Sequence, residues 1–200
     1  MLDYETKYYN QNIKLIAGVD EAGRGPLAGP VCVAAVIMPY DKNEIIEEIN
    51  DSKKLTEKKR EKLFDLIIEK AISYKIVLIN EKIIDEINIL NATKLGMKQA
   101  IEGLSVKPEL VLIDAVPLDL NIKNESIIKG DAKSYNIAAA SILAKVTRDR
   151  LMVELDQKYP NYNFKKHKGY GTKEHIENLK KFGKCEIHRN SFIKNFISNE

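Results

Sequence analysis

Four acidic residues stand where short apolar runs of the sequence end: Asp20, Glu21, Asp114 and Asp131. The runs have the composition of β-strands and cover residues 13–20, 110–114 and 126–129. Open α/β sheets bind their ligands in the crevice at the strand ends. We therefore expect the four carboxylates to converge at one edge of a sheet.

Converging carboxylates repel one another unless a cation lies among them. Oxygen ligands without an obligatory cysteine or histidine suit Mg²⁺ or Mn²⁺ better than Zn²⁺. Two such ions about 3.5–4 Å apart support in-line displacement at phosphorus, one positioning the attacking water and the other neutralising the leaving oxygen. The carboxylate pattern thus indicates metal-dependent hydrolysis of a phosphodiester.

A single aspartate at a strand end also has a structural interpretation, as a turn residue or a helix cap. Asp131 could cap the helix that follows it. Periodicity in the sequence does not show that the acids converge, so both interpretations stay open at this point.

The elements around these acids follow the pattern of an α/β layered domain with a mixed sheet. Further strands are expected at 30–38 and 74–79, and helices at 44–50, 56–71, 81–102, 134–157 and 173–182. Gly23 to Pro26 predict a tight or bulged connection between the first two strands. The helix 81–102 is expected to break near Asn88. The small residues 138–144 would let helix 134–157 approach the sheet closely, at the centre of the core.

The composition is that of an ordinary globular protein, with 200 residues, 44% hydrophobic and 30% charged. The two cysteines, Cys32 and Cys185, are too few for a disulfide scaffold and indicate reduced thiols. The chain has no signal-peptide pattern and no apolar run long enough for a membrane span. We therefore expect a cytoplasmic protein that does not contact a membrane.

The formal net charge of +3 conceals an uneven distribution. Residues 1–50 hold eight acidic and four basic residues, whereas residues 158–184 hold eight lysines and two acids. An acidic site flanked by a basic surface suits an enzyme that acts on a polyanion. A second basic cluster, residues 53–60, is expected to be a solvated helix face with one or two phosphate contacts.

The segment 165–172 places an aromatic side chain, Tyr170, between two glycines in a lysine-rich loop. The ring could stack on a sugar or base, and a solvated loop with a packed tyrosine is an equal alternative. His167 is the histidine best placed to assist a proton or a phosphate. Ser141 lies in the alanine-rich helix and is interpreted as a small packing residue.

Six segments together resemble the ribonuclease HII family, the type 2 ribonucleases H, over nearly the whole chain. They are Asp20-Glu21-Ala22-Gly23-Arg24-Gly25-Pro26-Leu27-Ala28-Gly29-Pro30, Asp51-Ser52-Lys53-Lys54-Leu55, Ile113-Asp114-Ala115, Lys129-Gly130-Asp131, 139–149 and 167–172. The resemblance implies a ribonuclease H-like fold with a mixed central sheet flanked by helices and a small C-terminal helical extension. It also implies two parts, a catalytic domain at 1–158 and a loop and helix segment at 159–200 that packs on it and carries substrate-binding residues.

The activity implied is that of an endoribonuclease that cuts the RNA strand of RNA–DNA hybrids and cleaves 5′ to single ribonucleotides embedded in duplex DNA, leaving 3′-hydroxyl and 5′-phosphate ends. The resemblance makes Asp20, Glu21, Asp114 and Asp131 the catalytic ligands of Mg²⁺ or Mn²⁺. Gly23, Arg24 and Gly25 match the motif that reads the ribonucleotide 2′-hydroxyl, and Tyr170 matches the tyrosine that stacks on the following deoxyribose. Lys53 and Lys168 are expected to contact the substrate.

Two rival interpretations are a ribonuclease HIII-like enzyme and a nucleic-acid-binding protein on a degenerate nuclease fold. The first is disfavoured because only about a dozen residues precede the first expected strand, and the second because the carboxylate set is intact. A monomer is expected. The aromatic spacing at 192–196 resembles a weak clamp-binding peptide, although packing of a short tail is the favoured interpretation.

Overall fold

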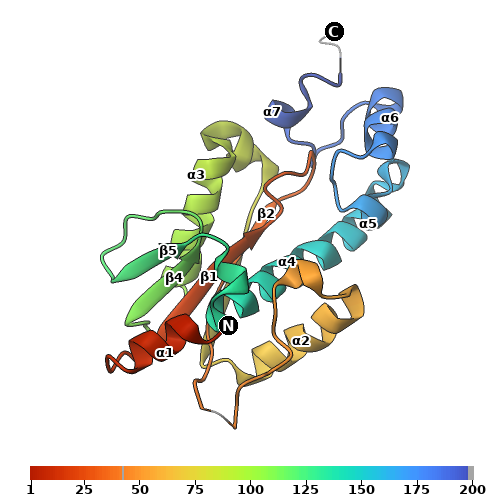
Figure 1. Ribbon diagram of the computed structural model, residues 1–200. Helices are drawn as coiled ribbons and strands as arrows, with labels where there is room; N and C mark the ends of the chain where they lie inside the picture. Colours follow the sequence, from red (N-terminus) through yellow and green to blue (C-terminus); the bar gives the residue numbers. More distant parts are fainter. Residues whose placement is uncertain (42, 198–200) are drawn as a thin grey trace.

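The computed structural model describes residues 1–41 and 43–197, which form a mixed five-stranded sheet flanked by helices (Figure 1). The strands are β1 (Ile16–Ala22), β2 (Val31–Ile37), β3 (Ser73–Ile79), β4 (Leu110–Asp114) and β5 (Asn124–Ile127). The helices are α1 (Asp3–Tyr9), α2 (Glu57–Lys70), α3 (Glu81–Glu102), α4 (Tyr135–Lys158), α5 (Phe164–His167), α6 (Lys173–Phe182) and α7 (Asn190–Ile193). Single 3₁₀ turns are η1 (Ser52–Lys54), η2 (Gly130–Ala132) and η3 (Pro160–Tyr162).

The strand order β3-β2-β1-β4-β5 combines two kinds of pairing. β1 is antiparallel to β2, and β2 is antiparallel to β3. β1 is parallel to β4, and β4 is parallel to β5. The carboxyl ends of β1, β4 and β5 therefore meet at one edge of the sheet, where the sequence predicts the acidic residues.

β2 shows why the sheet carries helices on both faces, because all of its residues are buried. Cys32, Ala34 and Val36 pack in one cluster with residues of α2 and α4. Val33 and its alternate neighbours pack in another cluster with residues of α3. A strand buried on both faces needs an almost continuous apolar sequence, as the valine-rich run at 31–37 provides.

The long helix α4 lies at the centre of the core, as predicted. Its small residues at 138–140 and 144 are completely buried. A Cβ at Gly18 of β1 would lie 2.0 Å from the backbone of Asn136, so the start of α4 sits directly on the strand. The Ser134 side chain caps the helix by accepting a hydrogen bond from Ile137 N–H at 3.3 Å.

Other expectations for the elements are confirmed or need correction. The break in α3 is confirmed, since Asn88 has φ 66° and ψ 165°. The predicted helix at 44–50 is wrong: the segment forms only turns, and Tyr135 Oη accepts the Ile46 N–H that a helix would use internally. β1 continues two residues past Asp20, and β5 begins and ends two residues earlier than expected. The connection between β1 and β2 is the loop 23–30 and not a tight turn.

The chain after α4 packs back on that helix and on the loop 23–30. Tyr162, Phe164 and Ile187 cluster with Met152 of α4 and with Ala28. At the far end Ile193 is buried beside Leu27 and Leu179, with Phe192 and Phe196 packed against the same cluster. The segment 192–196 thus packs as a tail. Across the described residues, no helix has both the length and the apolar character of a membrane span.

Candidate active site

A cavity of about 390 Å³ opens at the carboxyl edge of the sheet and gathers most residues that the sequence singles out. Its lining includes eight of the ten predicted site residues, all except Asp131 and Lys168. In full it comprises Asp20, Glu21, Ala22, Gly23, Arg24, Gly25, Ser52, Lys53, Asp114, Ser141, Lys145 and Tyr170. The residues come from β1, the loop 23–30, η1, β4, α4 and the segment after α5. The chain thus brings distant parts of its sequence together at one place.

Sheet register explains why two of the carboxylates lie side by side. β1 and β4 are parallel, and Val19 is the partner of Ile113. The next residues along both strands are Asp20 and Asp114, and alternation along each strand sends their side chains to the same face. That face is the one covered by α4, where Gly18 contacts the helix backbone.

Burial raises the cost of charge on the β1 acids. Asp20 is 4% exposed, and burial raises its pKa well above the usual range, with the charges of Glu21 and Asp114 adding to the effect. Glu21 also has a raised pKa, mainly through burial, although the Arg24 guanidinium 3.5 Å away opposes the rise. Such shifts are typical of functional carboxylates and of sites that accept cations.

Asp114 and Asp131 are connected through backbone and lysine contacts. Asp114 Oδ1 accepts the Gly130 N–H at 2.6 Å, while burial and the charge of Asp131 raise its pKa. Asp131 is 5% exposed, and its Oδ2 accepts a hydrogen bond from Lys53 Nζ at 3.3 Å. The capping interpretation of Asp131 is wrong for the helix α4, whose cap is Ser134.

The donor chemistry of these residues fits a hard divalent cation. Every candidate ligand is a carboxylate oxygen, the type that Mg²⁺ and Mn²⁺ prefer. Glu21 Oε2 is buried and has no hydrogen-bond partner among the described residues. Within residues 1–41 and 43–197, however, no three acidic, histidine or cysteine side chains form a ready-made metal cage. An ion would therefore have to draw the side chains together.

The loop 23–30 contributes two glycines to the cavity for different reasons. Gly23 has φ +95°, and a Cβ there would lie 2.0 Å from Nε of Arg148. A Cβ at Gly25 would meet only Tyr170 Cε1, at an ordinary 3.8 Å. The fold thus requires glycine at position 23, whereas at position 25 it leaves space in the cavity wall.

Tyr170 lines the cavity from the other side, and 44% of the residue is exposed. Its ring lies 6.0 Å from the Arg148 guanidinium carbon. The segment that carries it is tied to the loop 23–30, because Leu27 N–H donates to Gly169 O at 2.8 Å. The ring is therefore held beside the cavity and is accessible to solvent.

The structure bears on two sequence expectations in this segment, for His167 and Lys168. His167 is 8% exposed: its Nε2 bonds Tyr162 O at 2.8 Å, and its Nδ1 accepts Gly169 N–H at 3.2 Å. Both ring nitrogens are occupied inside the protein, so the expectation that His167 assists a proton or phosphate is wrong. The Lys168 side chain donates a hydrogen bond to the Lys165 carbonyl and is not among the residues that line the cavity, and its contact with the substrate stays a prediction.

Three polar residues of the cavity were given no role by sequence reasoning. Ser141 Oγ lies 2.7 Å from Ser52 Oγ and hydrogen-bonds Asp20, which favours the charged carboxylate. Lys145 Nζ donates to Asp149 at 2.9 Å, one helical turn along α4. From the sequence alone, Ser141 is interpreted as a packing residue because its neighbours in the helix are alanines. The available signal was its spacing, which puts Ser141 and Lys145 on one face of the helix.

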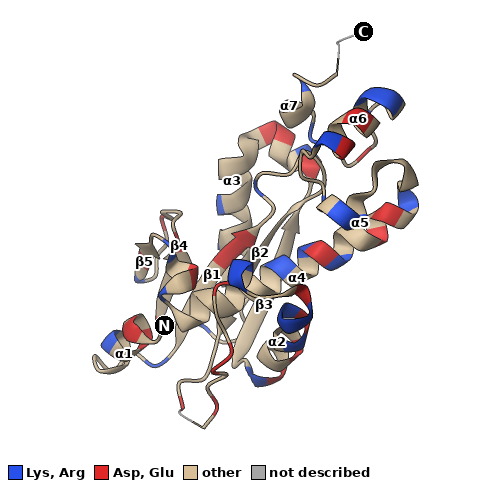
Figure 2. Ribbon diagram, turned by 45° about the vertical axis from the view of Figure 1, so that its right-hand side comes forward, with Lys and Arg blue, Asp and Glu red and all other residues tan. Residues whose placement is uncertain are grey.

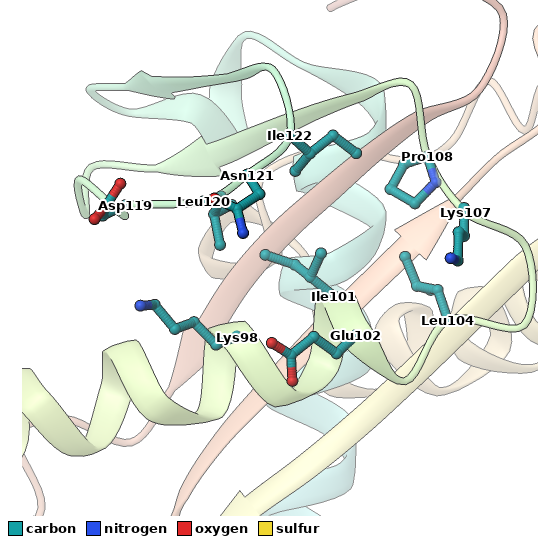
Figure 3. Close-up of a pocket in the computed structure, with 10 residues that line it drawn as sticks. All are labelled: Lys98, Ile101, Glu102, Leu104, Lys107, Pro108, Asp119, Leu120, Asn121 and Ile122. Carbon is teal, nitrogen blue, oxygen red and sulfur yellow. The ribbon is translucent and has the colours of Figure 1, made fainter.

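A larger cavity, about 770 Å³, lies on the α3 side of the sheet and contains none of the predicted site residues (Figure 3). It opens between the last turns of α3 and the segments on either side of β4 (Figure 3). Lys98 and Glu102 of α3 face Asp119 and Leu120 across it (Figure 3). This cavity is lined by scattered charged residues and aliphatic side chains, without a cluster of carboxylates like that of the smaller cavity. The larger volume therefore does not identify the functional site.

Comparisons with known proteins find a family that matches most of the chain. The family described as Ribonuclease HII matches residues 17–195. The ribonuclease HII of Acetivibrio thermocellus is 62% identical over 198 residues, which cover 98% of this chain and 77% of that protein.

Solved structures give the same result for the fold. Ribonuclease H2 from Pyrococcus horikoshii OT3 has a TM-score of 0.74 and 32% identity, covering 88% of this chain and 92% of that one. The ribonuclease HII of Archaeoglobus fulgidus, solved in a complex with PCNA, has a TM-score of 0.77 and 26% identity, covering 93% of this chain and 98% of that one. The predicted ribonuclease H-like fold is confirmed.

Proposed function

Because this chain belongs to the ribonuclease HII family and is an endoribonuclease of RNA–DNA hybrids, we propose that it also cleaves 5′ to single ribonucleotides embedded in duplex DNA. The products are a 3′-hydroxyl and a 5′-phosphate. The observation that carries the proposal is the joint lining of one cavity by buried carboxylates, the loop 23–30 and Tyr170.

The carboxylates Asp20, Glu21, Asp114 and Asp131 hold the divalent ions, Mg²⁺ or Mn²⁺, in this proposal. Support comes from the oxygen-only donor set, the raised pKa values of Asp20 and Asp114, and the unpartnered Oε2 of Glu21. When bound, two such ions supply positive charge that activates water and offsets charge at the phosphodiester. The protein's own part is to fix the carboxylates on β1, β4 and η2.

Recognition of the ribonucleotide falls to Gly23, Arg24 and Gly25. The 2′-hydroxyl is the group that distinguishes RNA from DNA. The space at Gly25 supports this role, because a missing side chain lets the substrate approach the backbone closely. Tyr170 stacks on the next deoxyribose, and Lys53 supplies a positive charge beside Asp131.

Basic side chains on two helices support binding of a polyanionic duplex. Figure 2 shows lysine and arginine along much of α2 and at the end of α6. Lys180 and Lys181 lie in the last turn of α6, inside the lysine-rich segment 158–184. In this view residues 159–200 form the part that carries Tyr170 and extends the substrate surface of the catalytic part, 1–158.

The decisive assay compares two substrates, a DNA duplex with one ribonucleotide and a long RNA–DNA hybrid, with Mg²⁺ and Mn²⁺ in turn. We expect cleavage of both substrates, metal dependence, and cutting on the 5′ side of the single ribonucleotide. Cleavage of the long hybrid alone would identify a ribonuclease HIII-like specificity. Binding of both without any cleavage would identify a degenerate nuclease fold.

Tyr170→Ala tests recognition of the junction. Cleavage at the single ribonucleotide should fall about 10-fold or more, because base or sugar stacking contributes about 1–3 kcal/mol, and cutting of the long hybrid should fall less. Tyr74→Ala is a matched control, since Tyr74 is also exposed, at 39%, but lies on β3 outside the cavity. An equal loss on both substrates would contradict the stacking role.

A further inference from the structure

Two arginines are buried beneath the loop 23–30 without a carboxylate partner. Arg148 of α4 is 1% exposed, and Arg189, just before α7, is 0% exposed. Neither forms an ion pair within the described part of the chain. A buried charge is costly unless its donors are satisfied, so the partners of these guanidinium groups indicate what they do.

All three hydrogen bonds of the Arg189 guanidinium among the described residues go to carbonyl groups of the loop 23–30. Its Nη2 donates to Gly23 O at 2.6 Å, its Nη1 to Arg24 O at 2.9 Å and its Nε to Gly29 O at 2.9 Å. In a trans peptide the N–H points opposite to the carbonyl. The N–H groups of Arg24 and Gly25 are therefore turned away from Arg189, and both residues line the cavity.

Arg148 differs from Arg189 because it binds two separate segments. Its Nε donates to Pro30 O at 2.9 Å and its Nη2 to Ala28 O at 3.1 Å, both in the loop 23–30. Its Nη1 donates to Lys168 O at 2.9 Å, and its guanidinium carbon lies 6.0 Å from the centre of the Tyr170 ring. One side chain thus holds the loop of the glycine motif and the segment of the stacking tyrosine.

Both segments carry a glycine where a larger residue would overlap Arg148 or the carbonyl groups that it binds. A Cβ at Gly23 would lie 2.0 Å from Arg148 Nε. A Cβ at Gly169, which has φ +84°, would lie 2.5 Å from Ala28 O. These close approaches leave little freedom for one segment to move without the other.

We propose that Arg148 is a positioning residue that couples the loop 23–30 to Tyr170, so that the 2′-hydroxyl and the following deoxyribose are read as one unit. Arg189 positions the loop 23–30 alone. This inference rests on the proposed function, since it concerns how the two halves of that recognition are held together.

Lysine cannot replace either arginine in this role. The guanidinium is a planar fork with five donors, whereas an ammonium is a compact point charge with a flexible stem. Burial lowers the pKa of Arg189 to about 9 and the pKa of Arg148 from its usual value as well. Arginine is not deprotonated in proteins, and an Arg→Lys change removes the fork of donors.

The experiment measures kcat/KM on the single-ribonucleotide duplex and on the long hybrid for Arg148→Lys, Arg189→Lys and Arg150→Lys. Arg150 is the matched control, because it lies on the same helix, is exposed, and pairs with Glu61. Thermal unfolding of each variant reports whether the fold is retained. The same assays on Tyr170→Ala and on the double variant Arg148→Lys/Tyr170→Ala complete a cycle.

We expect Arg148→Lys to lower cleavage of the single-ribonucleotide duplex by about 10- to 100-fold, the loss that a misplacement of about 1 Å produces. The loss on the long hybrid should be smaller. The double variant should have the same ratio of the two activities as Tyr170→Ala alone. Arg189→Lys should lower both activities by a similar factor. Arg150→Lys should behave as the wild type.

The coupling is overturned if folded Arg148→Lys keeps the wild-type ratio of the two activities, or if its effect is undiminished in the Tyr170→Ala background. It is also overturned if folded Arg189→Lys lowers the ratio of the two activities instead of lowering both equally. Where Arg148→Lys does not fold, this result on Arg189→Lys decides the matter. A wild-type enzyme that cuts only the long hybrid would overturn the proposed single-ribonucleotide activity first, and the coupling with it.

Discussion

Charge is buried in two neighbouring regions of this protein, and the two regions satisfy it in opposite ways. The acidic region consists of Asp20, Glu21, Asp114 and Asp131 at the carboxyl edge of the sheet. The basic region consists of Arg148, Arg189, His167, His175 and His188, between the loop 23–30 and the C-terminal segment, each at most 8% exposed. In the acidic region the carboxylates repel one another and Glu21 Oε2 has no partner among the described atoms.

In the basic region the protein satisfies its own donors. Each guanidinium donates three hydrogen bonds to backbone carbonyls. His175 and His188 form a hydrogen-bonded chain, and the partner of each ring nitrogen indicates whether that nitrogen carries a proton. His175 Nδ1 donates to Tyr170 O at 2.9 Å, so its Nε2 accepts from His188 Nε2 at 3.1 Å, and His188 Nδ1 accepts the Cys185 N–H at 2.9 Å.

This difference in hydrogen bonding distinguishes a region that supports the structure from a region that binds a ligand. A buried polar network with every group paired rigidifies the structure around it. Buried like charges without enough partners are retained where a ligand completes them. The basic region therefore fixes the loops, and in the proposed function a metal ion completes the acidic region.

The largest effect is expected from Asp20→Asn. Cleavage should fall by at least on the order of 10³-fold, because metal charge stabilisation contributes several kcal/mol and each 1.36 kcal/mol is a factor of ten. The free energy of unfolding without metal should stay equal or rise, because a neutral amide relieves the repulsion by Glu21 and Asp114. Hydrolysis assays and denaturant unfolding measure the two quantities.

Asp65→Asn provides the control for this change, since the Asp65 side chain is 77% exposed on α2. It should alter neither activity nor stability appreciably. Full activity in Asp20→Asn would exclude the carboxylate mechanism. A large loss of stability in that variant would show that the Asp20 charge is part of the scaffold.

The next largest effects are expected from substitutions of Gly23 and Gly25 in the loop 23–30. The first should affect stability and the second should affect cleavage. Gly23→Ala should destabilise the protein by roughly 2–5 kcal/mol, because it combines an unfavourable positive φ with overlap onto Arg148. Gly25→Ala should change stability by less than about 0.5 kcal/mol and still lower cleavage about 10-fold or more, since a methyl group would occupy substrate space. A Gly25→Ala enzyme with normal activity would contradict close backbone approach at this position.

Sequence reasoning located the acidic region because parallel strands carry their carboxyl ends to one edge. Asp114 is the last residue of β4, as predicted, and Asp20 lies beside it through the register with β1. Asp131, beyond the end of β5, also followed from the strand-end pattern, but with a helix cap as its alternative, which only the resemblance disfavoured. The general α/β pattern and the long central helix also followed from apolar runs and small residues.

The basic region could not be predicted in the same way. Arg148 and Arg189 bind backbone carbonyls, which every residue carries, so no pair of residue types in the sequence marks the contact. His167 looked accessible in a lysine-rich loop, but the chain turns at Asn163 and Lys168, both with positive φ, and places the ring inside. The segment 44–50 has helical spacing, yet Tyr135 takes its backbone donor.

Acid should destabilise the basic region through its histidine chain. Burial, and then the neighbouring His175, lower the pKa of His188 from 6.5 to about 4. The unfolded state therefore binds more protons between pH 6.5 and 4, and the free energy of unfolding falls as the pH falls through that window. The shift corresponds to about 3 kcal/mol, at 1.36 kcal/mol for each pKa unit.

Denaturant unfolding of the wild type and of His188→Gln across this pH range measures the effect. Glutamine keeps a hydrogen-bonding side chain and removes the titration, so the variant should show a flatter dependence between pH 6.5 and 4. An equally steep dependence in both proteins would mean that the loss of stability arises outside this chain of histidines.

The smallest effect is expected from Lys53→Met, which tests whether the acidic region has a counter-charge of its own. Lys53 Nζ lies 3.3 Å from Asp131 Oδ2, but the lysine side chain is 80% exposed. Exposed ion pairs contribute about 0–1 kcal/mol, and salt screens them. Metal-free stability should therefore fall by less than about 1 kcal/mol at low salt, and the difference should shrink at high salt.

Lys54→Met is the control, because Lys54 is an exposed lysine of the same 3₁₀ turn and does not line the cavity. Both variants lose one positive charge near the edge, so only the difference between them reports the contact with Asp131. A loss of several kcal/mol confined to Lys53→Met would make the lysine a structural partner of the carboxylates. The two regions would then bury charge by the same rule, and the acidic edge would no longer depend on metal for its neutralisation.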